Sequence, residues 1–275
     1  DPEMSRGLGD VYKRQNIYNK LFVFTTSSLY LSTTTLTKIS LPAGRRKKIL
    51  DFCNKINYIL YLVELPELSA SYGGERRMTE NTITCTDFYS LEENIIRNFT
   101  ANNKLDVLAH TLKVRDNALI LARKYVIDYE QARNAALLHD ISTLIPVENY
   151  LSIAEALDLE IFPAEREFPS LLHQRISRIV AVETFNVVDK EVLNAVNCHT
   201  TLRRGAAPLD KLLFLADKLS REGKDTPAYM PLVRKAAEVS LDNAVKCYFE
   251  NLMLNKDSLQ VMHPWLSEAW EEIRG

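Results

Sequence analysis

Apolar residues recur at the three- and four-residue spacing of amphipathic helices through almost the whole chain after Met78. The pattern predicts helices over residues 92–99, 104–125, 147–157, 171–185, 228–238 and 240–255. Three more helices are expected to begin after Asp128, after Asp189 and at Pro208. Gln131 stands three residues after Asp128, which is the spacing of a capping box. Because this region contains no strand pattern, the predicted fold class is all-α, a helical bundle.

The first 77 residues have a different character. Residues 21–41 are rich in Thr, Leu and Phe, which is typical of strands, and Gly73-Gly74 interrupts any period before Met78. We therefore predict two parts, an N-terminal extension over 1–77 and a helical domain over 78–275. The extension is interpreted as small and irregular, as disordered, or as an artefact, since RGLGDVYKRQ resembles translated adapter sequence.

Composition excludes several classes of function. Hydrophobic residues make up 46% of the chain, charged residues 25%, and the formal net charge is −2, which gives no electrostatic case for nucleic acid. The four cysteines form no CxxC pair and are interpreted as reduced thiols of the cytoplasm. The most apolar run, residues 58–68, is too short to cross a bilayer. We expect a cytoplasmic protein with a small-molecule partner, no nucleic acid and no membrane, and leave a homodimer open.

Histidines and aspartates interrupt the apolar stripes of this helical region. A single such histidine is more often a satisfied core residue than a ligand, and a single aspartate is more often a cap or a surface charge. Two carboxylates in apolar runs, Asp140 in LLHDI and Asp217 in FLADKL, would be costly to bury without partners. Pairing with histidines or with a cation would satisfy them. The residues that make up this constellation are His110, His139, Asp140, His173, His199 and Asp217.

Each of these side chains is expected to project from a different helical segment, as in metal sites built inside helical bundles. Mixed His and Asp ligands favour iron, manganese or another borderline divalent ion. Such an ion can lower the pKa of a bound water and polarise a phosphoryl oxygen. The constellation therefore predicts a divalent metal site, with iron as the first choice.

Several stretches resemble a known family. The order H…HD…H…H…D resembles the HD-domain metal-dependent phosphohydrolases, and AHTLKVRDNALILARKY, AALLHDIS, LLHQRISRIVA, NCHTTLRRG and LDKLLFLADKLS resemble its YqeK family. Members of that family are symmetrical bis(5′-nucleosyl)-tetraphosphatases. The resemblance covers roughly residues 88 to 270. It implies an HD-domain helical bundle that cleaves diadenosine tetraphosphate into two ADP.

Carried over by position, the resemblance assigns roles to individual residues. It implies Asp140 and His139 as catalytic residues, with Asp140 orienting or deprotonating the attacking water. The implied metal ligands are His110, His139, Asp140 and Asp217, and the implied substrate contacts are Asp140, His173, His199, Thr200, Arg203 and Asp217. His173, His199 and Thr200 would face the phosphates or a second metal, and Arg203 would neutralise the polyphosphate.

Two departures from the family bear on the substrate. Many relatives have Lys three residues after the HD doublet, where this chain has Thr143, and many continue after FLAD with Glu-Pro and Arg, where this chain has KLSREGKDTP. Two alternatives therefore stay open. One is an HD-domain phosphohydrolase for another nucleotide, such as a mono- or triphosphate or an alarmone. The other is a catalytically silent nucleotide-binding module.

Overall fold

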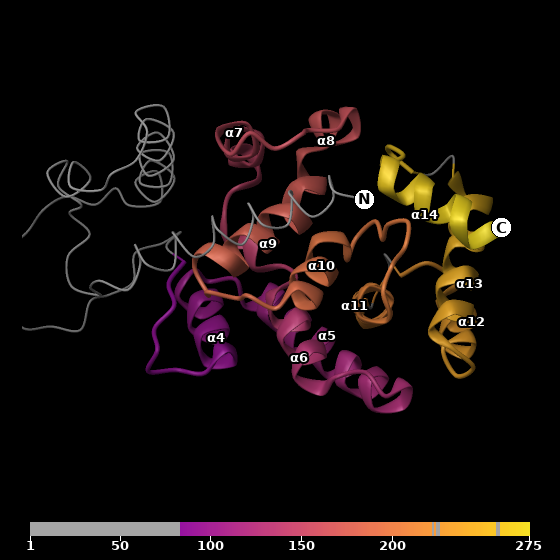
Figure 1. Cartoon of the computed structure of the whole chain (residues 1–275), viewed down its shortest axis with the longest axis horizontal. Coiled ribbons are helices and arrows are strands. Elements are labelled where there is room, and N and C mark those ends of the chain that lie inside the picture. The colour runs from indigo at the N-terminus through magenta and orange to yellow at the C-terminus, as the bar shows by residue number, and fades with distance from the viewer. Residues whose placement is uncertain (1–82, 222, 224–225, 257–258) are drawn as a thin grey trace, which may run out of the picture. The chain divides into compact units, whose positions relative to one another are not determined.

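Helix α5 (Leu105–Tyr125) is the longest described helix, and it packs against both α6 (Tyr129–Leu138) and α11 (Pro208–Ser220). The structure, a computed structural model, describes residues 83–221, 223, 226–256 and 259–275. The predictions for residues 1–77 and for a boundary at residue 78 lie outside these ranges. Among the described residues there is no β-strand, which confirms the all-α class (Figure 1).

The remaining elements include the other predicted helices in their expected order, together with the short helix α8, the last helix α14 and three 3₁₀ turns. They are α4 (Leu91–Ala101), η1 (Ile141–Leu144), η2 (Val147–Asn149), α7 (Tyr150–Ala156), α8 (Pro163–Glu167), η3 (Pro169–Leu172), α9 (His173–Glu183), α10 (Lys190–Cys198), α12 (Met230–Ala236), α13 (Leu241–Leu254) and α14 (Pro264–Arg274), where η marks a 3₁₀ turn. Within the described ranges, no helix combines the length and the apolar character needed to cross a bilayer.

Small residues let α6 approach its neighbours closely. Ala132, Ala135 and Ala136 are fully buried, and α6 contacts α5, α10 and α11. The distance between packed helices falls with the size of the side chains between them. The C-terminal end of α6, where His139 is the C-cap residue, therefore lies among several helices rather than at a free surface.

The N-caps of α6 and α10 are linked to each other. Asp128 accepts a hydrogen bond from the Gln131 amide at 2.8 Å, as the spacing predicts. The Gln131 side chain, however, donates from Nε2 to Asp189 Oδ2 at 2.9 Å, and Asp189 in turn caps α10. In a capping box the Gln131 side chain would accept a hydrogen bond from the Asp128 backbone amide. Here it bonds to Asp189 instead and so connects the first turns of α6 and α10.

The segment between Pro163 and Pro169 contains the short helix α8, which the predicted helices do not include. It forms around Glu165, whose buried carboxylate accepts hydrogen bonds from the Phe162 amide at 2.9 Å and from Arg175 at 2.8 Å. His263, the N-cap residue of α14, lies with Nε2 at 3.5 Å from the other carboxylate oxygen. Glu165 therefore connects α8, α9 and the start of the last helix.

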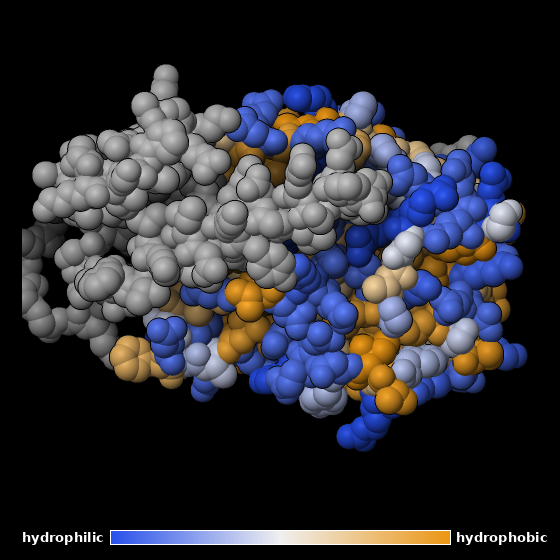
Figure 2. All heavy atoms as spheres, in the orientation of Figure 1, coloured by the Kyte–Doolittle hydropathy of each residue, from blue (hydrophilic) through white to orange (hydrophobic). Residues whose placement is uncertain are grey.

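The surface seen in Figure 2 is mostly hydrophilic where the structure describes it, with apolar side chains in separate areas. Large apolar residues that are well exposed include Phe88, Ile120, Val126, Val188, Val239 and Leu254. Scattered exposure of this kind is ordinary on protein surfaces.

Replacing Glu165 with Gln should lower the free energy of unfolding at pH 7 by about 3 kcal/mol, because it removes one partner of a buried ion pair. Burial by itself would raise the pKa of the Glu165 carboxyl, but His263, the Phe162 amide and Arg175 outweigh it and hold that pKa below its ordinary value. The stabilisation is therefore present above the unfolded-state pKa of about 4.3 and is lost as the pH falls through the folded-state pKa.

Urea unfolding of wild type and Glu165→Gln from pH 7 down to about pH 3 measures this effect. The difference between their free energies of unfolding should become smaller as the pH falls. Glu155→Gln is the matched control, since Glu155 is exposed and pairs with Arg166 at 3.3 Å. That change should cost less than about 0.5 kcal/mol. A difference between wild type and Glu165→Gln that does not vary with pH contradicts the prediction.

Candidate metal centre

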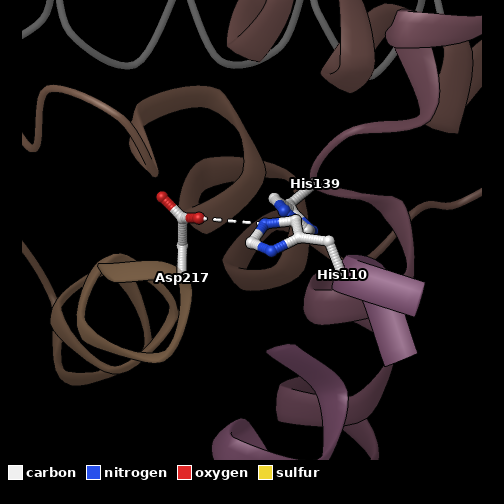
Figure 3. Close-up of side chains that lie close together, drawn as sticks. All are labelled: His110, His139 and Asp217. Atoms are coloured by element: carbon white, nitrogen blue, oxygen red, sulfur yellow. Dashed lines mark hydrogen bonds and ion pairs between the residues drawn. The ribbon is translucent and has the colours of Figure 1, made fainter. Parts of the chain in front are cut away.

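His110 and Asp217 face each other from two helices that pack together, α5 and α11. His110 projects from α5, and its Nε2 lies 3.2 Å from Oδ1 of Asp217 on α11, with the His139 ring beside them (Figure 3). The ligand-type atoms of His110, His139 and Asp217 all lie within 4.8 Å of one another. The sequence placed these residues on separate helical segments, and the fold brings their side-chain tips together.

Asp140 lies between two groups of histidines. Its Oδ2 is 3.2 Å from His139 Nε2 and 3.9 Å from His110 Nε2. Its Oδ1 is 3.6 Å from His173 Nε2 and 3.5 Å from His199 Nε2. Each oxygen of this carboxylate therefore faces a different pair of imidazoles, so Asp140 joins them into one cluster.

Backbone carbonyls fix the orientation of three of the four imidazoles. Nδ1 of His139 donates to Ala136 O at 2.7 Å, and His199 and His173 make the same bond to the carbonyl three residues earlier, at 2.8 and 2.7 Å. A carbonyl only accepts, so Nδ1 carries the proton in each ring. In the neutral ring, Nε2 is then left with a lone pair, and it is Nε2 that faces the cluster.

The histidine nitrogens approach one another closely. Nε2 of His173 and Nε2 of His199 are 3.0 Å apart. Two lone pairs at that distance repel unless a proton or a cation lies between them. Two nitrogen ligands bound at about 2.1 Å to one ion, at a right angle, would themselves be about 3 Å apart. The spacing is therefore the one expected of two ligands that share an ion.

Charge in the cluster is held by the two carboxylates. Burial opposes ionisation of Asp140, yet His139 and His199 outweigh it and hold the pKa of Asp140 well below its ordinary value. For Asp217 burial is outweighed in the same way, first by Lys218 and then by His110, and its pKa is also well below the ordinary range. Both side chains are therefore ionised at neutral pH and available to a cation.

The pKa values of the histidines shift in different directions. Burial disfavours protonation of His139, but Asp140 more than compensates and raises its pKa. Burial lowers the pKa of His173, and it lowers that of His199 to about 4. His199 is therefore neutral at pH 7 and can donate its Nε2 lone pair. His139 Nε2 is buried without a hydrogen-bond partner, so a cation would satisfy a polar atom that the protein leaves unpaired.

These observations fit a divalent ion. The donors are imidazole nitrogens and carboxylate oxygens, a set that suits iron, manganese and similar ions. A second group of three, formed by His139, Asp140 and His199, also has its ligand-type atoms within 4.8 Å. The cluster can therefore hold a metal ion, and Asp140 could contribute an oxygen on each side.

Lys218 fixes the orientation of Asp217. Its Nζ lies 2.7 Å from Asp217 Oδ2 and 5.0 Å from the centre of the Phe214 ring, and its side chain is buried. With Oδ2 occupied, Oδ1 is turned toward His110. Sequence reasoning missed Lys218, although its place beside Asp217 in an apolar helix was a usable signal, because a buried lysine requires an anionic partner.

Gln174 is a second residue that sequence reasoning missed. It is fully buried, and its Oε1 accepts a hydrogen bond from the Thr200 amide at 3.1 Å. Thr200 Oγ1 lies 3.0 Å from His173 Nε2, so the predicted pair His173 and Thr200 is together at the cluster. Gln174 thus connects the start of α9 to the turn that follows α10.

Arg203 is held elsewhere. Its guanidinium donates to Asp210 Oδ2 through Nε at 3.1 Å and through a terminal nitrogen at 2.8 Å. Asp210 lies in the first turn of α11, two turns before Asp217. These bonds direct Arg203 to the start of α11, and its role as a phosphate contact remains a prediction. At the position where many relatives have Lys, Thr143 donates its hydroxyl to the Asp140 carbonyl at 2.6 Å.

The part of the chain that contains the cluster matches a family of known proteins. The model of the HD domain family matches residues 107–222, a range that contains all six residues of the cluster. A protein of Lactococcus lactis subsp. cremoris, described as an uncharacterized protein in the pepC 5′ region, is 38% identical over 147 residues, 54% of this chain and 74% of the relative. A symmetrical bis(5′-nucleosyl)-tetraphosphatase of Halalkalibacterium halodurans is 30% identical over 139 residues, 50% of this chain and 71% of the relative.

Among solved structures, a predicted HD superfamily hydrolase involved in NAD metabolism from Clostridium acetobutylicum is similar. It has a TM-score of 0.60 and 30% sequence identity, and the match covers 68% of this chain and 97% of that one. The similarity therefore extends over nearly the whole of the solved chain.

Ferrous iron or manganese should stabilise the metal-free protein, because an ion that binds only the folded state shifts the unfolding equilibrium. At a free concentration about 100 times the Kd, the gain is about 2.7 kcal/mol. Asp217→Asn should reduce metal affinity by more than the roughly 10- to 100-fold expected for loss of a supporting residue. Elemental analysis and thermal unfolding with added metal measure both effects.

Asp116→Asn is the control, since Asp116 is an exposed carboxylate on the same helix as His110 and pairs with Arg115 at 2.7 Å. It should leave metal content and the metal-dependent rise in Tm unchanged. An equal rise in Tm for wild type and Asp217→Asn would show that the ion binds somewhere else.

Proposed function

Because the chain belongs to the HD-domain hydrolases of the YqeK type, we propose that it hydrolyses phosphoanhydride bonds of nucleotides, with symmetrical cleavage of diadenosine tetraphosphate into two ADP as its reaction. One observation carries the proposal. The carboxylate of Asp140 faces four histidines at 3.2–3.9 Å, inside a domain that matches the HD family. The name of the H. halodurans relative supports the choice of substrate.

The resident ion in this proposal is divalent, with iron first and manganese or another borderline ion next. When bound, such an ion lowers the pKa of a coordinated water and polarises a phosphoryl oxygen. The residues that would hold it are His110, His139, Asp140 and Asp217. Asp217 keeps one oxygen for this role because Lys218 occupies the other.

Asp140 is proposed to orient or deprotonate the attacking water. Two features support this role. Its pKa is held well below the ordinary value, so the carboxylate is ionised and can accept a hydrogen bond from water. Its Oδ1 also faces His173 and His199, on the side where a second ion or the phosphates of the substrate would lie. In-line attack would then depend mainly on positioning and on neutralisation of charge.

His173, His199 and Thr200 are proposed to face the phosphate chain or a second ion. His199 can act as a neutral ligand or acceptor at pH 7, since burial lowers its pKa to about 4. The Thr200 hydroxyl, next to His173, can donate to a phosphate oxygen. Arg203 is proposed to approach the phosphates after exchanging Asp210 for the substrate.

A related substrate is the second candidate. Thr143 is bound to the Asp140 carbonyl at the place where many relatives have a lysine, so one phosphate-binding cation of those relatives is missing. Another nucleotide, such as a mono- or triphosphate or an alarmone, would use the same metal ligands and the same water.

The test is a panel of nucleotides assayed with added ferrous iron or manganese, with product identification by chromatography. Diadenosine tetraphosphate should give ADP as the main product and should react faster than mono- and triphosphates. Asp140→Ala should reduce kcat by at least about a hundredfold, because it removes both a metal ligand and the acceptor for the proton of water.

Asp116→Asn again serves as the control and should keep full activity. If ATP together with AMP is formed instead of ADP, cleavage is asymmetrical and the proposed reaction is wrong. If the wild type contains no divalent ion and hydrolyses nothing in the panel with either metal added, the proposed nucleotide hydrolase activity is excluded.

A further inference from the structure

Two cationic side chains lie against the same oxygen of Asp217, and they differ in exposure. Lys218 Nζ is 2.7 Å from Oδ2, and Arg221 is 3.4 Å from it through a terminal guanidinium nitrogen. The side chain of Lys218 is 4% exposed, whereas that of Arg221 is 52% exposed. The two residues are therefore suited to different roles.

Lys218 cannot leave Asp217 without a large cost. Both side chains are buried, so separating them would leave an uncompensated charge in the interior. Its ammonium also lies over the ring of Phe214, which adds to the attraction. Lys218 is a positioning residue that sets which oxygen of Asp217 points to His110.

Arg221 is free to change partners at small cost. A separation of 3.4 Å is long for a charge-assisted hydrogen bond, and the Arg221 side chain is 52% exposed, so water can solvate its charge when it leaves Asp217. Arg221 is the C-cap residue of α11, so it lies where the helix that carries Asp217 ends. If Arg221 moves away, Lys218 still balances the charge of Asp217.

A phosphate chain needs such a cation here. The cluster already contains the negative charges of Asp140 and Asp217, and a nucleotide adds more. A guanidinium can donate two parallel hydrogen bonds to phosphate oxygens. Thr143 supplies no charge. Arg203 is bound to Asp210 by two hydrogen bonds, so of the two arginines Arg203 and Arg221, Arg221 is the better placed to bind phosphate.

We propose that Arg221 binds the phosphates of the substrate, exchanging its weak contact with Asp217 for a paired contact with phosphate oxygens. This inference rests on the proposed function, because it takes the ligand to be a nucleotide polyphosphate. It assigns substrate binding to Arg221 and the orientation of Asp217 to Lys218.

The experiment compares wild type, Arg221→Gln and Arg221→Lys, each loaded with manganese. Three quantities are measured: metal content by elemental analysis, affinity for ADP by calorimetry, and KM and kcat for diadenosine tetraphosphate. Arg166→Gln is the matched control, since Arg166 is 58% exposed and pairs with one carboxylate, Glu155, at 3.3 Å.

Arg221→Gln should weaken ADP binding and raise KM by about 10- to 100-fold, the loss expected for a hydrogen-bonded charge. Its kcat should change much less, and its metal content should equal that of the wild type. Arg221→Lys should recover part of the affinity, because it keeps the charge but not the paired geometry. Arg166→Gln should match the wild type throughout.

The inference is overturned if Arg221→Gln binds ADP within twofold of the wild type, or if it loses the metal, which would make Arg221 a support of Asp217. It is also overturned if the metal-loaded wild type does not bind ADP. A loss of ADP affinity in Arg221→Gln, together with a wild type that hydrolyses no nucleotide, would reject the proposed reaction and retain the phosphate-binding role of Arg221.

Discussion

The burial of two ionised carboxylates among four imidazoles is the constraint on which the rest of the structure depends. Asp140 and Asp217 lie at the meeting point of α5, α6, α10 and α11, and burial there opposes their charge. Histidines compensate both, and Lys218 compensates Asp217 in addition. Because buried charges without partners cost several kcal/mol, the helices that carry the partners must pack together for the domain to fold. The fold and the cluster are thus one energetic unit.

Backbone geometry makes the cluster specific as well as charged. His139, His173 and His199 each lie at an end of a helix and donate Nδ1–H to the carbonyl three residues earlier. The tautomer is therefore set by local structure, before any long-range contact is made. All three rings then present Nε2, and packing of the helices brings these atoms together. His110 lies inside α5, where the backbone carbonyls accept the helix's own hydrogen bonds, and its Nε2 faces Asp217 instead.

Much of this could be predicted from sequence, because periodicity and caps are local signals. The order of the helices, the caps at Asp128 and Asp189 and the presence of His110, His139 and Asp217 in one cluster followed from apolar spacing and from the cost of burying carboxylates. Other features depend on contacts between distant segments. Helix α8 forms around Glu165, which pairs with Arg175 and His263, and the side chain of Gln131 bonds to Asp189 instead of the backbone amide of Asp128. No spacing rule specifies such partners.

The metal is consequently better specified than the substrate. The proposed ligands are short side chains, several of them oriented by backbone carbonyls or by a buried lysine, so few alternative arrangements exist. Phosphate contacts come from long cationic side chains, which have many rotamers and can exchange one carboxylate for another at small cost. Arg203 was selected by its position in the sequence, yet its two hydrogen bonds are to Asp210. The contact of Arg221 with Asp217 is longer, at 3.4 Å, and a weak ion pair of this kind lets a guanidinium exchange a carboxylate of the protein for a phosphate of the substrate.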